Sequence, residues 1–411
     1  MTATALQQEE HLPEAIVCKW CGKSFHYLKS HISMGRCENI PDSAKGLDVD
    51  EVVKMYTSAF PDEPTISRTA LAKLNEKRAE KHSGEGKVAE ISAHPGYAGT
   101  VEYKTELVAA HELLGVTIKE LGTPRGKPLQ VTVNVNTPYP EFVPEAKKNY
   151  VYGDFDLIKD IFMMLEIGIP GYLWGHAGTG KSSLPTQLCA LLNRPLIRAQ
   201  HTASMEEAHV TGQILARDGS TYFEPGLLAL AMKNGWVYLA DEYDFAFPQI
   251  LGVYQPVLEG EPLIIKEATP DWRRITPHKR FAFIGTGNTN GSGDETGLYQ
   301  GTNIQNAANF SRFGIVSNVK YMSTKAEVNM LAEAGVIREY AEKMVKFANL
   351  VREGYEQHLI SQPIGPRELL LSAKIGMMRG DFSAGIEKSF INKLPSTSAQ
   401  AAREVVQKIF G

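Results

Sequence analysis

The stretch GHAGTGKS, residues 175–182, has the composition of a loop that wraps around phosphate. It fits the pattern GxxxxGK[ST], in which glycines let successive backbone N–H groups turn toward phosphate oxygens. Lys181 would reach the β and γ phosphates, and the Ser182 hydroxyl would ligate Mg²⁺. An apolar strand is expected before the loop and a helix after it, which argues against a chance match. The residues expected to contact ATP here are Gly175, His176, Ala177, Gly178, Thr179, Gly180, Lys181, Ser182 and Ser183.

A second apolar stretch, GWVYLADEYD at residues 235–244, ends in acidic residues. Asp241 would hold Mg²⁺ through water, and Glu242 would polarise the water that attacks the γ-phosphate. In isolation these acids could merely cap a loop. Because they follow the phosphate loop by about 60 residues, we expect them to complete a site for nucleotide hydrolysis.

A third strand is expected in RFAFIGTGNTN, residues 280–290, and it ends in polar residues. The Asn288 amide could hydrogen-bond both the γ-phosphate and the attacking water. A plain turn asparagine is the alternative, and the residues alone do not separate the two.

Three of the four cysteines lie close together near the N-terminus. Cys18 and Cys21 form a C-x2-C pair, and His31 and Cys37 follow at spacings typical of a tetrahedral Zn²⁺ site. His26 is the competing histidine, although its place before an apolar turn favours His31. So small a unit would depend on the metal to fold.

The role of this zinc finger stays open between two partners. Basic side chains would give it a positive face that favours nucleic acid, but small zinc modules also bind proteins. These side chains are Lys19, Lys23, Lys29 and Arg36. A second basic stretch, residues 261–283, is expected to form a hairpin that either binds an acidic polymer or protein segment or is simply solvated. Its members are Lys266, Trp272, Arg273, Arg274, Lys279 and Arg280.

Length and composition constrain the elements that must position these residues. The chain has 411 residues, is 43% hydrophobic and carries a formal net charge of −4, which argues against coating nucleic acid by bulk charge. Without a signal sequence or a membrane-spanning stretch, we expect a cytoplasmic protein. The predicted regions are a flexible tail (1–16), a zinc-finger module (17–40), a linker with a small α/β segment (41–145), an ATPase core (146–322) and a helical lid (323–411).

Local patterns predict further elements outside the nucleotide site. Helices are expected at 48–60 and 67–82, separated by prolines, and period-two alternation predicts a strand at 129–137. Residues 212–226 are expected to form a hairpin around Asp218-Gly219. Cys189 is expected to be a buried helical thiol.

The motifs GHAGTGKS, LADEYD, GTGNT and GDETGLYQGTNIQNAANFSRFGIV together resemble the MoxR branch of the AAA+ ATPases. Within that branch they are most similar to the ATPase subunits of aerobic cobaltochelatase (CobS type), over about residues 140–380. This resemblance implies an α/β fold, with a P-loop core of parallel sheet between helices, a C-terminal helical lid and the zinc finger as an addition.

The resemblance also implies a homo-oligomeric ring, commonly a hexamer, with ATP between neighbouring subunits. Arg312 resembles the arginine finger that one subunit donates to the next, although the family usually has an acid where this chain has Ser311. A surface arginine near a helix end is the alternative. Arg367 resembles a second sensor at the start of a lid helix, and Pro366 suits the first turn of that helix.

These features favour a ring-forming ATPase that remodels a partner and is addressed by its zinc finger. The resemblance implies a partner with a von Willebrand A-like domain. A nucleic-acid-handling motor, a true cobaltochelatase subunit and a nucleotide-gated scaffold are the alternatives, and Glu242 argues against the last.

Overall fold

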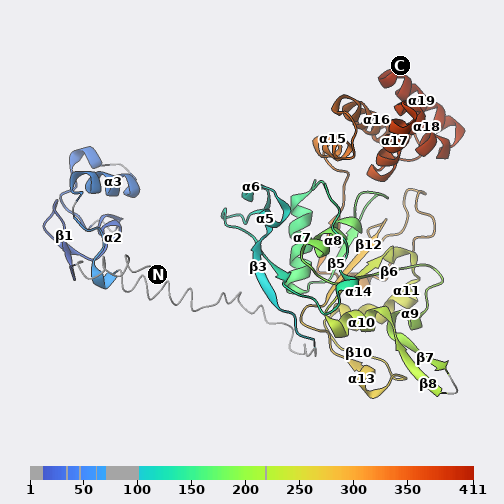
Figure 1. Ribbon diagram of the computed structural model, residues 1–411, viewed down its shortest axis with the longest axis horizontal. Coiled ribbons are helices and arrows are strands. Elements are labelled where there is room, and N and C mark those ends of the chain that lie inside the picture. The colour runs from blue at the N-terminus through green and yellow to red at the C-terminus, as the bar shows by residue number, and fades with distance from the viewer. Residues whose placement is uncertain (1–12, 34–35, 46–47, 62, 71–100, 218–219) are drawn as a thin grey trace. The chain divides into compact units, whose positions relative to one another are not determined.

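The computed structural model describes residues 13–33, 36–45, 48–61, 63–70, 101–217 and 220–411 (Figure 1). The chain forms two compact units, Met1–Ser92 and Ala93–Gly411, and each is described by itself. Most of the helix predicted at 67–82, the first twelve residues of the N-terminal tail and the Asp218-Gly219 turn lie outside the described residues. Within the described ranges, none of the helices combines the length and the apolar character required to cross a membrane.

The first unit is a short hairpin with helices packed around it. Strands β1 (Ile16–Val17) and β2 (Ser24–Phe25) pair antiparallel and lead into α2 (Leu28–Ser33). After the turn η1 (Asp42–Ala44), the predicted helix appears as α3 (Val49–Ala59) and packs on α2. Tyr56 of α3 is fully buried and lies edge-on to Trp20 at 4.8 Å between ring centroids. Part of the segment predicted as linker therefore completes the core of this unit.

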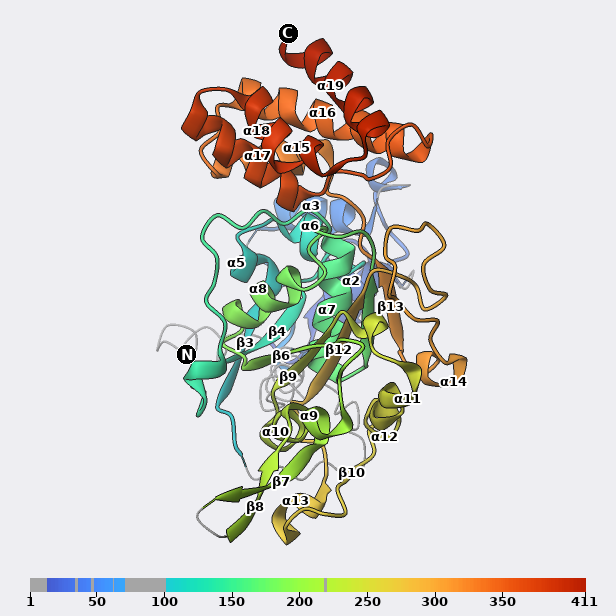
Figure 2. The same cartoon turned by 90° about the vertical axis from the view of Figure 1, so that its right-hand side faces the viewer.

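The second unit is built on a five-stranded parallel sheet in the order β13–β5–β12–β9–β6 (Figures 1 and 2). Alternate residues of its strands enter two different cores. Tyr172, Tyr238 and Phe283 face one cluster, and their chain neighbours Leu173, Leu239 and Ile284 face the other. The strands are β5 (Gly171–Trp174), β6 (Leu196–Gln200), β9 (Val237–Asp241), β12 (Ala282–Gly287) and β13 (Ile315–Asn318).

Helices cover both faces of this sheet, as expected when parallel strands are buried on both sides. Helices α7 (Phe155–Ile167) and α8 (Ser183–Leu191) cover one face, and the buried Cys189 belongs to α8 as predicted. The other face is covered mainly by α10 (Leu227–Asn234) and the turns that follow β9. These and nearby short elements are α9 (Glu207–Thr211), η3 (Tyr243–Phe245), α11 (Pro248–Leu251), η4 (Gly252–Tyr254), α12 (Gln255–Leu258) and α14 (Ala307–Phe310).

Three small antiparallel pairs are attached to the core. The strand predicted at 129–137 is β4 (Gln130–Asn134), which pairs with β3 (Thr105–Ala109) and packs with α5 (Ala110–Leu114) and α6 (Ile118–Leu121) onto α7; η2 (Pro140–Phe142) follows. The first predicted hairpin is confirmed as β7 (Gly212–Arg217) and β8 (Ser220–Pro225). In the second, β10 (Leu263–Ile264) pairs with β11 (Arg274–Ile275) around α13 (Pro270–Arg273).

The C-terminal helices form a bundle with its own apolar core. A buried ion pair joins the first two helices, because Arg352 donates to both carboxylate oxygens of Glu327 at 2.8 and 2.7 Å. The helices are α15 (Thr324–Glu333), α16 (Arg338–Glu356), α17 (Pro366–Arg379), α18 (Phe382–Ser389) and α19 (Ser396–Phe410), with η5 (Ile391–Lys393) between the last two.

Candidate functional site

A cavity of about 830 Å³ lies at the carboxyl ends of the central strands, between the core and the C-terminal bundle. Its wall contains most of the residues that the sequence predicts for the nucleotide site. From the core these are Lys181, Ser182, Asp241, Glu242 and Asn288, and from the first turn of α17 it is Arg367. Arg312 is not among the residues described as lining it.

The phosphate loop joins β5 to α8, as the pattern predicts. Gly178 and Gly180 have φ values of 79° and 103°, a conformation that side chains other than glycine rarely adopt. The Lys181 ammonium is folded back onto the loop and donates to the Gly175 and His176 carbonyls at 2.7 and 2.8 Å. It also donates to Asn288 Oδ1 at 3.1 Å. Burial lowers the pKa of Lys181 to about 8, against the attraction of nearby acids.

Asp241 is the centre of a dense hydrogen-bond network. Its Oδ1 accepts from the hydroxyls of Ser182 and Thr286, both at 2.5 Å. Its Oδ2 accepts from the Arg198 guanidinium. Although burial favours the neutral acid, these three donors hold the pKa of Asp241 below its ordinary value. The two oxygen donors predicted for Mg²⁺, on Ser182 and Asp241, are therefore brought together.

Glu242 follows Asp241 in a left-handed backbone conformation, with φ of 53°. The carboxylate is exposed and accepts from Gln200 Nε2 at 2.5 Å. The backbone N–H of Glu242 donates to Thr286 Oγ1 at 3.2 Å. A non-glycine residue in this region of φ is uncommon and often marks a functional site.

Asp244 is a site residue that the sequence reasoning did not assign. It is fully buried, and one oxygen accepts from the backbone N–H groups of Asn288 and Thr289 at 2.8 and 2.9 Å. The Thr289 hydroxyl adds a third bond at 3.0 Å. Burial raises the pKa of this carboxyl. Asp244 thus fixes the loop that presents Asn288, and its place three residues after Asp241 is the signal that could have identified it.

Tyr299, in the stretch TGLYQGT, is a second residue that was not assigned. Its hydroxyl lies 2.9 Å from His176 Nδ1 and accepts from the Ala177 N–H at 3.1 Å. The same chain segment reaches the other side of the site, because the Asn303 N–H donates to the Asp244 carbonyl at 2.7 Å. This segment therefore connects the phosphate loop with the acidic turn.

Arg312 lies just after α14, away from the cavity of its own chain. Its Nε donates to Glu259 Oε1 at 2.7 Å, and another nitrogen donates to the Ala308 carbonyl. About a quarter of the Arg312 side chain is exposed, 26%, so a neighbouring molecule could reach it.

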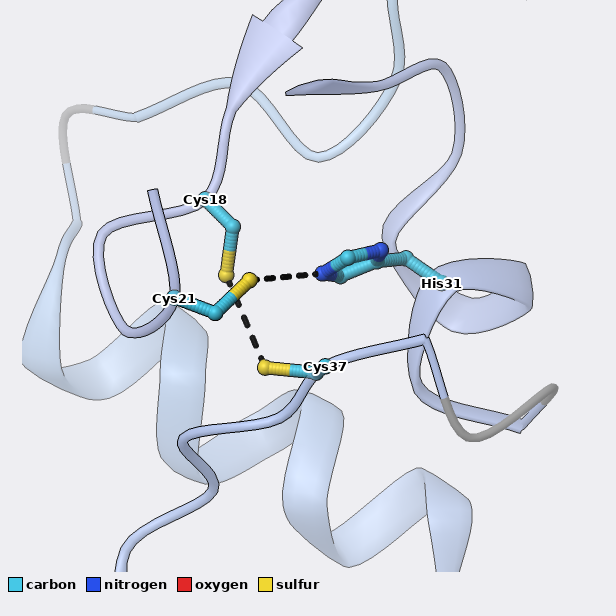
Figure 3. Close-up of side chains that lie close together, drawn as sticks. All are labelled: Cys18, Cys21, His31 and Cys37. Atoms are coloured by element: carbon cyan, nitrogen blue, oxygen red, sulfur yellow. Dashed lines mark hydrogen bonds between the residues drawn. The ribbon is translucent and has the colours of Figure 1, made fainter. Parts of the chain in front are cut away.

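The four residues predicted as zinc ligands converge in the first unit (Figure 3). Their ligand atoms all lie within 4.8 Å of one another. Cys18 Sγ and Cys37 Sγ are 3.8 Å apart, close to the roughly 3.8 Å expected of two thiolates bound tetrahedrally at about 2.3 Å. Cys21 Sγ lies 3.3 Å from His31 Nε2. This donor set fits zinc.

The local backbone explains how the ligands come together. The Cys18 carbonyl accepts from the Gly22 N–H at 2.8 Å, and the Cys18 N–H donates to the Lys23 carbonyl at 2.9 Å, which closes the turn between the first two ligands. His31 comes from α2. His26, the competing histidine, lies instead against Ser67 Oγ at 3.1 Å. Burial raises the pKa of Cys37 to about 12, so a thiolate there needs a nearby cation.

Several basic side chains considered for nucleic acid have partners within the protein. Lys19 pairs with Glu63 at 2.7 Å, and Lys23 pairs with Glu38. In the second unit, Arg280 is half-buried and lies over the Tyr103 ring at 5.9 Å. The exposed members of that stretch are Lys266, Arg273, Arg274 and Lys279.

The chain is similar in sequence to known proteins. Residues 172–302 match the AAA domain of the dynein-related subfamily. The chain is 32% identical over 249 residues to the aerobic cobaltochelatase subunit CobS of Sinorhizobium sp, covering 58% of this chain and 74% of CobS. It is 23% identical over 265 residues to an uncharacterized protein of Staphylococcus aureus, covering 62% of this chain and 96% of that protein. The RuvB Holliday junction branch migration motor of Thermotoga maritima aligns over 65% of this chain and 72% of RuvB, with 13% identity and a TM-score of 0.38.

Proposed function

This chain belongs to the family of AAA+ ATPases that contains CobS, and we propose that it couples ATP hydrolysis to the remodelling of a partner. It is an ATPase, with the parallel sheet and phosphate loop of that class. The remodelling activity is our inference from the C-terminal bundle, which shares the nucleotide cavity with the core. Binding of ATP between two such bodies can change their relative position, and that movement can be transmitted to a partner.

Each of the six cavity residues predicted from the sequence has a chemical role in this proposal. Lys181 would leave the loop carbonyls to bind the β and γ phosphates. Ser182 and Asp241 would hold Mg²⁺, which would supply positive charge against the charge that develops. Glu242 polarises the attacking water. Asn288 orients that water and the γ-phosphate, and Arg367 from α17 binds the phosphates from the lid side.

The observation that carries the proposal is the shared position of Lys181, Asp241 and Glu242 around one cavity. We expect Glu242→Gln to lower ATP turnover at least about a hundredfold, because the attacking water loses its base. ATP binding should be kept, and Lys181→Ala should lose both binding and turnover. Phosphate release and fluorescent-nucleotide binding measure the two properties. Glu261→Gln, which changes an exposed acid outside the cavity, is the matched control. Full turnover in Glu242→Gln would refute the assignment.

We further propose a homo-oligomeric ring, commonly hexameric in this branch, in which Arg312 acts on the neighbour's ATP. Arg312 does not line the cavity of its own chain and is partly exposed, as a residue used between subunits must be. A guanidinium stabilises the charge that develops as the γ-phosphoryl group departs.

The zinc module is proposed to bind Zn²⁺ through Cys18, Cys21, His31 and Cys37 and to address the ATPase to its partner. Replacing both Cys18 and Cys21 by Ser should leave ATP turnover near that of the unaltered protein, because the ATPase lies in a separate unit. Partner binding should be lost. Lost turnover with intact binding would contradict this role.

A cobaltochelatase subunit is the second candidate function, favoured by the 32% identity to CobS. That activity would require a partner with a von Willebrand A-like domain. Cobalt insertion into a corrin ring by this chain with such a partner, dependent on ATP, would establish it. A nucleic-acid motor remains an outcome to test. ATP turnover stimulated by DNA, with steep salt dependence, would support that alternative over a protein client.

A further inference from the structure

Strand β6 lies at the edge of the sheet beside β9 and places two side chains against the acidic pair. In the parallel register, Arg198 is opposite Leu239 and Gln200 is opposite Asp241. Arg198 and Gln200 are two residues apart, so they project from the same face of the strand. Arg198 binds Asp241 and Gln200 binds Glu242. One edge strand therefore contacts both acids of the hydrolysis site.

The Asp241 carboxylate has no acceptor position left in this arrangement. A carboxylate offers about four lone-pair sites. Two hydroxyls, from Ser182 and Thr286, take Oδ1. Arg198 Nε donates to Oδ2 at 2.6 Å, and the second guanidinium nitrogen donates to the same oxygen. A hydrated magnesium ion that uses Asp241 must replace one of these donors.

The guanidinium is the donor that can leave. The Asp241 side chain is only 3% exposed, whereas the Arg198 side chain is 56% exposed and borders the same cavity. Thr286 is buried beneath the carboxylate, and Ser182 is itself a predicted ligand of the metal. Of the three side chains that donate to Asp241, only Arg198 carries a positive charge, so it alone competes with a divalent cation for the charge of the acid.

We propose that Arg198 is the resident counter-ion of Asp241 and competes with Mg²⁺ for this carboxylate. The inference rests on the proposed nucleotide site. In the nucleotide-free protein Arg198 neutralises the buried acid and keeps it in place. When Mg²⁺ arrives with the nucleotide, the guanidinium leaves Asp241 and turns toward the solvent side of the cavity.

A magnesium titration of nucleotide binding tests this exchange. The probe is a fluorescent ADP analogue at fixed concentration, with the full-length chain, and the readout is the Mg²⁺ concentration at half-maximal signal. Arg198→Gln should lower that midpoint about fivefold, the effect of losing an ion pair that is partly exposed. Arg198→Lys keeps the positive charge with fewer hydrogen-bond donors. Its Mg²⁺ midpoint should lie between those of the unaltered protein and Arg198→Gln. Arg125→Gln removes the same charge at an exposed turn outside the cavity and should leave the midpoint unchanged.

Each outcome has a distinct meaning. A midpoint that does not move in Arg198→Gln would make the pair a structural contact only and would overturn the exchange. A higher midpoint would make Arg198 a ligand of the nucleotide phosphates, which also overturns it. If Arg198→Gln does not fold, as judged by its unfolding temperature, the shift in Arg198→Lys decides. Absence of magnesium-dependent binding in the unaltered protein would instead contradict the proposed nucleotide site.

Discussion

At the scale of single residues, Asp244 is a buried acid whose role is to position Asn288. Its carboxylate accepts a hydrogen bond from the backbone N–H of Asn288, whose side chain is the predicted phosphate contact. We expect Asp244→Ala to lower the free energy of unfolding by about 2 kcal/mol, because the N–H groups of Asn288 and Thr289 lose their acceptor in a buried place. Asp244→Asn keeps a carbonyl oxygen and should lose less than half of this. Urea unfolding measures both, and equal losses would show that charge rather than hydrogen bonding matters.

His201, the residue that follows β6, predicts how stability changes with pH. Its ring is fully buried, with Nδ1 donating to the Ala199 carbonyl at 3.0 Å and Nε2 lying 2.8 Å from the Tyr254 hydroxyl. Burial lowers the pKa of His201 to about 4, from an ordinary value of 6.5. Below pH 6.5 the His201 ring is therefore protonated in the unfolded chain, whereas in the folded chain it stays neutral down to about pH 4. The free energy of unfolding is not reduced by this group above pH 6.5, and it decreases as the pH falls from 6.5 toward 4.

The size of this effect follows from the two pKa values. Between pH 7 and pH 5, protonation of His201 in the unfolded chain should cost about 2 kcal/mol of unfolding free energy. Other groups also titrate there, so the test compares the unaltered protein with His201→Gln. The change in unfolding free energy between pH 7 and pH 5 should be about 2 kcal/mol smaller in the variant. An identical pH dependence in both proteins would show that His201 charges freely in the folded state.

At the scale of elements, the sequence predicted best where a motif fixes its own backbone. The phosphate loop, the strand ending at Asp241 and the hairpin of β7 and β8 all follow from local composition and spacing. The sequence did not predict contacts between residues that are distant along the chain. Arg198 contacts Asp241 because β6 and β9 are neighbours in the sheet, and the local sequence LIRAQ does not indicate that partner. Tyr299 likewise reaches His176 only through a long loop.

The zinc module shows the same limit and yields a prediction of its own. The spacing of the ligands could be recognised in the sequence, but the packing of α3 could not. Tyr56 of α3 contacts Trp20, and its hydroxyl accepts from the Lys19 N–H at 3.0 Å, so these contacts join residues far apart in the chain. We expect removal of zinc by a strong chelator to make residues 16–60 open to protease while the ATPase unit resists it, because so small a core depends on its metal. Limited proteolysis with mass spectrometry, alongside zinc release to a dye, follows both events. Protection without zinc would show that α3 and the apolar core suffice.

At the scale of the whole molecule, the proposed ring would complete each nucleotide site with Arg312 of a neighbouring chain. In a single chain Arg312 pairs with Glu259, across a contact in which the Glu259 side chain is 49% exposed. Such an exposed pair is worth little, so a neighbour's triphosphate can compete for the guanidinium. An isolated subunit should therefore bind ATP with little turnover. Glu259→Gln should keep turnover or raise it, because Arg312 is no longer held by its own chain.

Mixing two inactive variants tests the shared site without any structure of the assembly. Lys181→Ala lacks a working phosphate loop but carries an intact Arg312, and Arg312→Ala has the reverse defect. In a ring with head-to-tail contacts, random mixing in equal amounts should restore about a quarter of the interfaces, where an intact loop meets an intact arginine. Phosphate release should then rise well above that of either variant alone. Lys181→Ala mixed with the double variant Lys181→Ala, Arg312→Ala is the control, because no working loop is present. If the mixture stays as inactive as its components while it still assembles, Arg312 does not act on a neighbour's nucleotide.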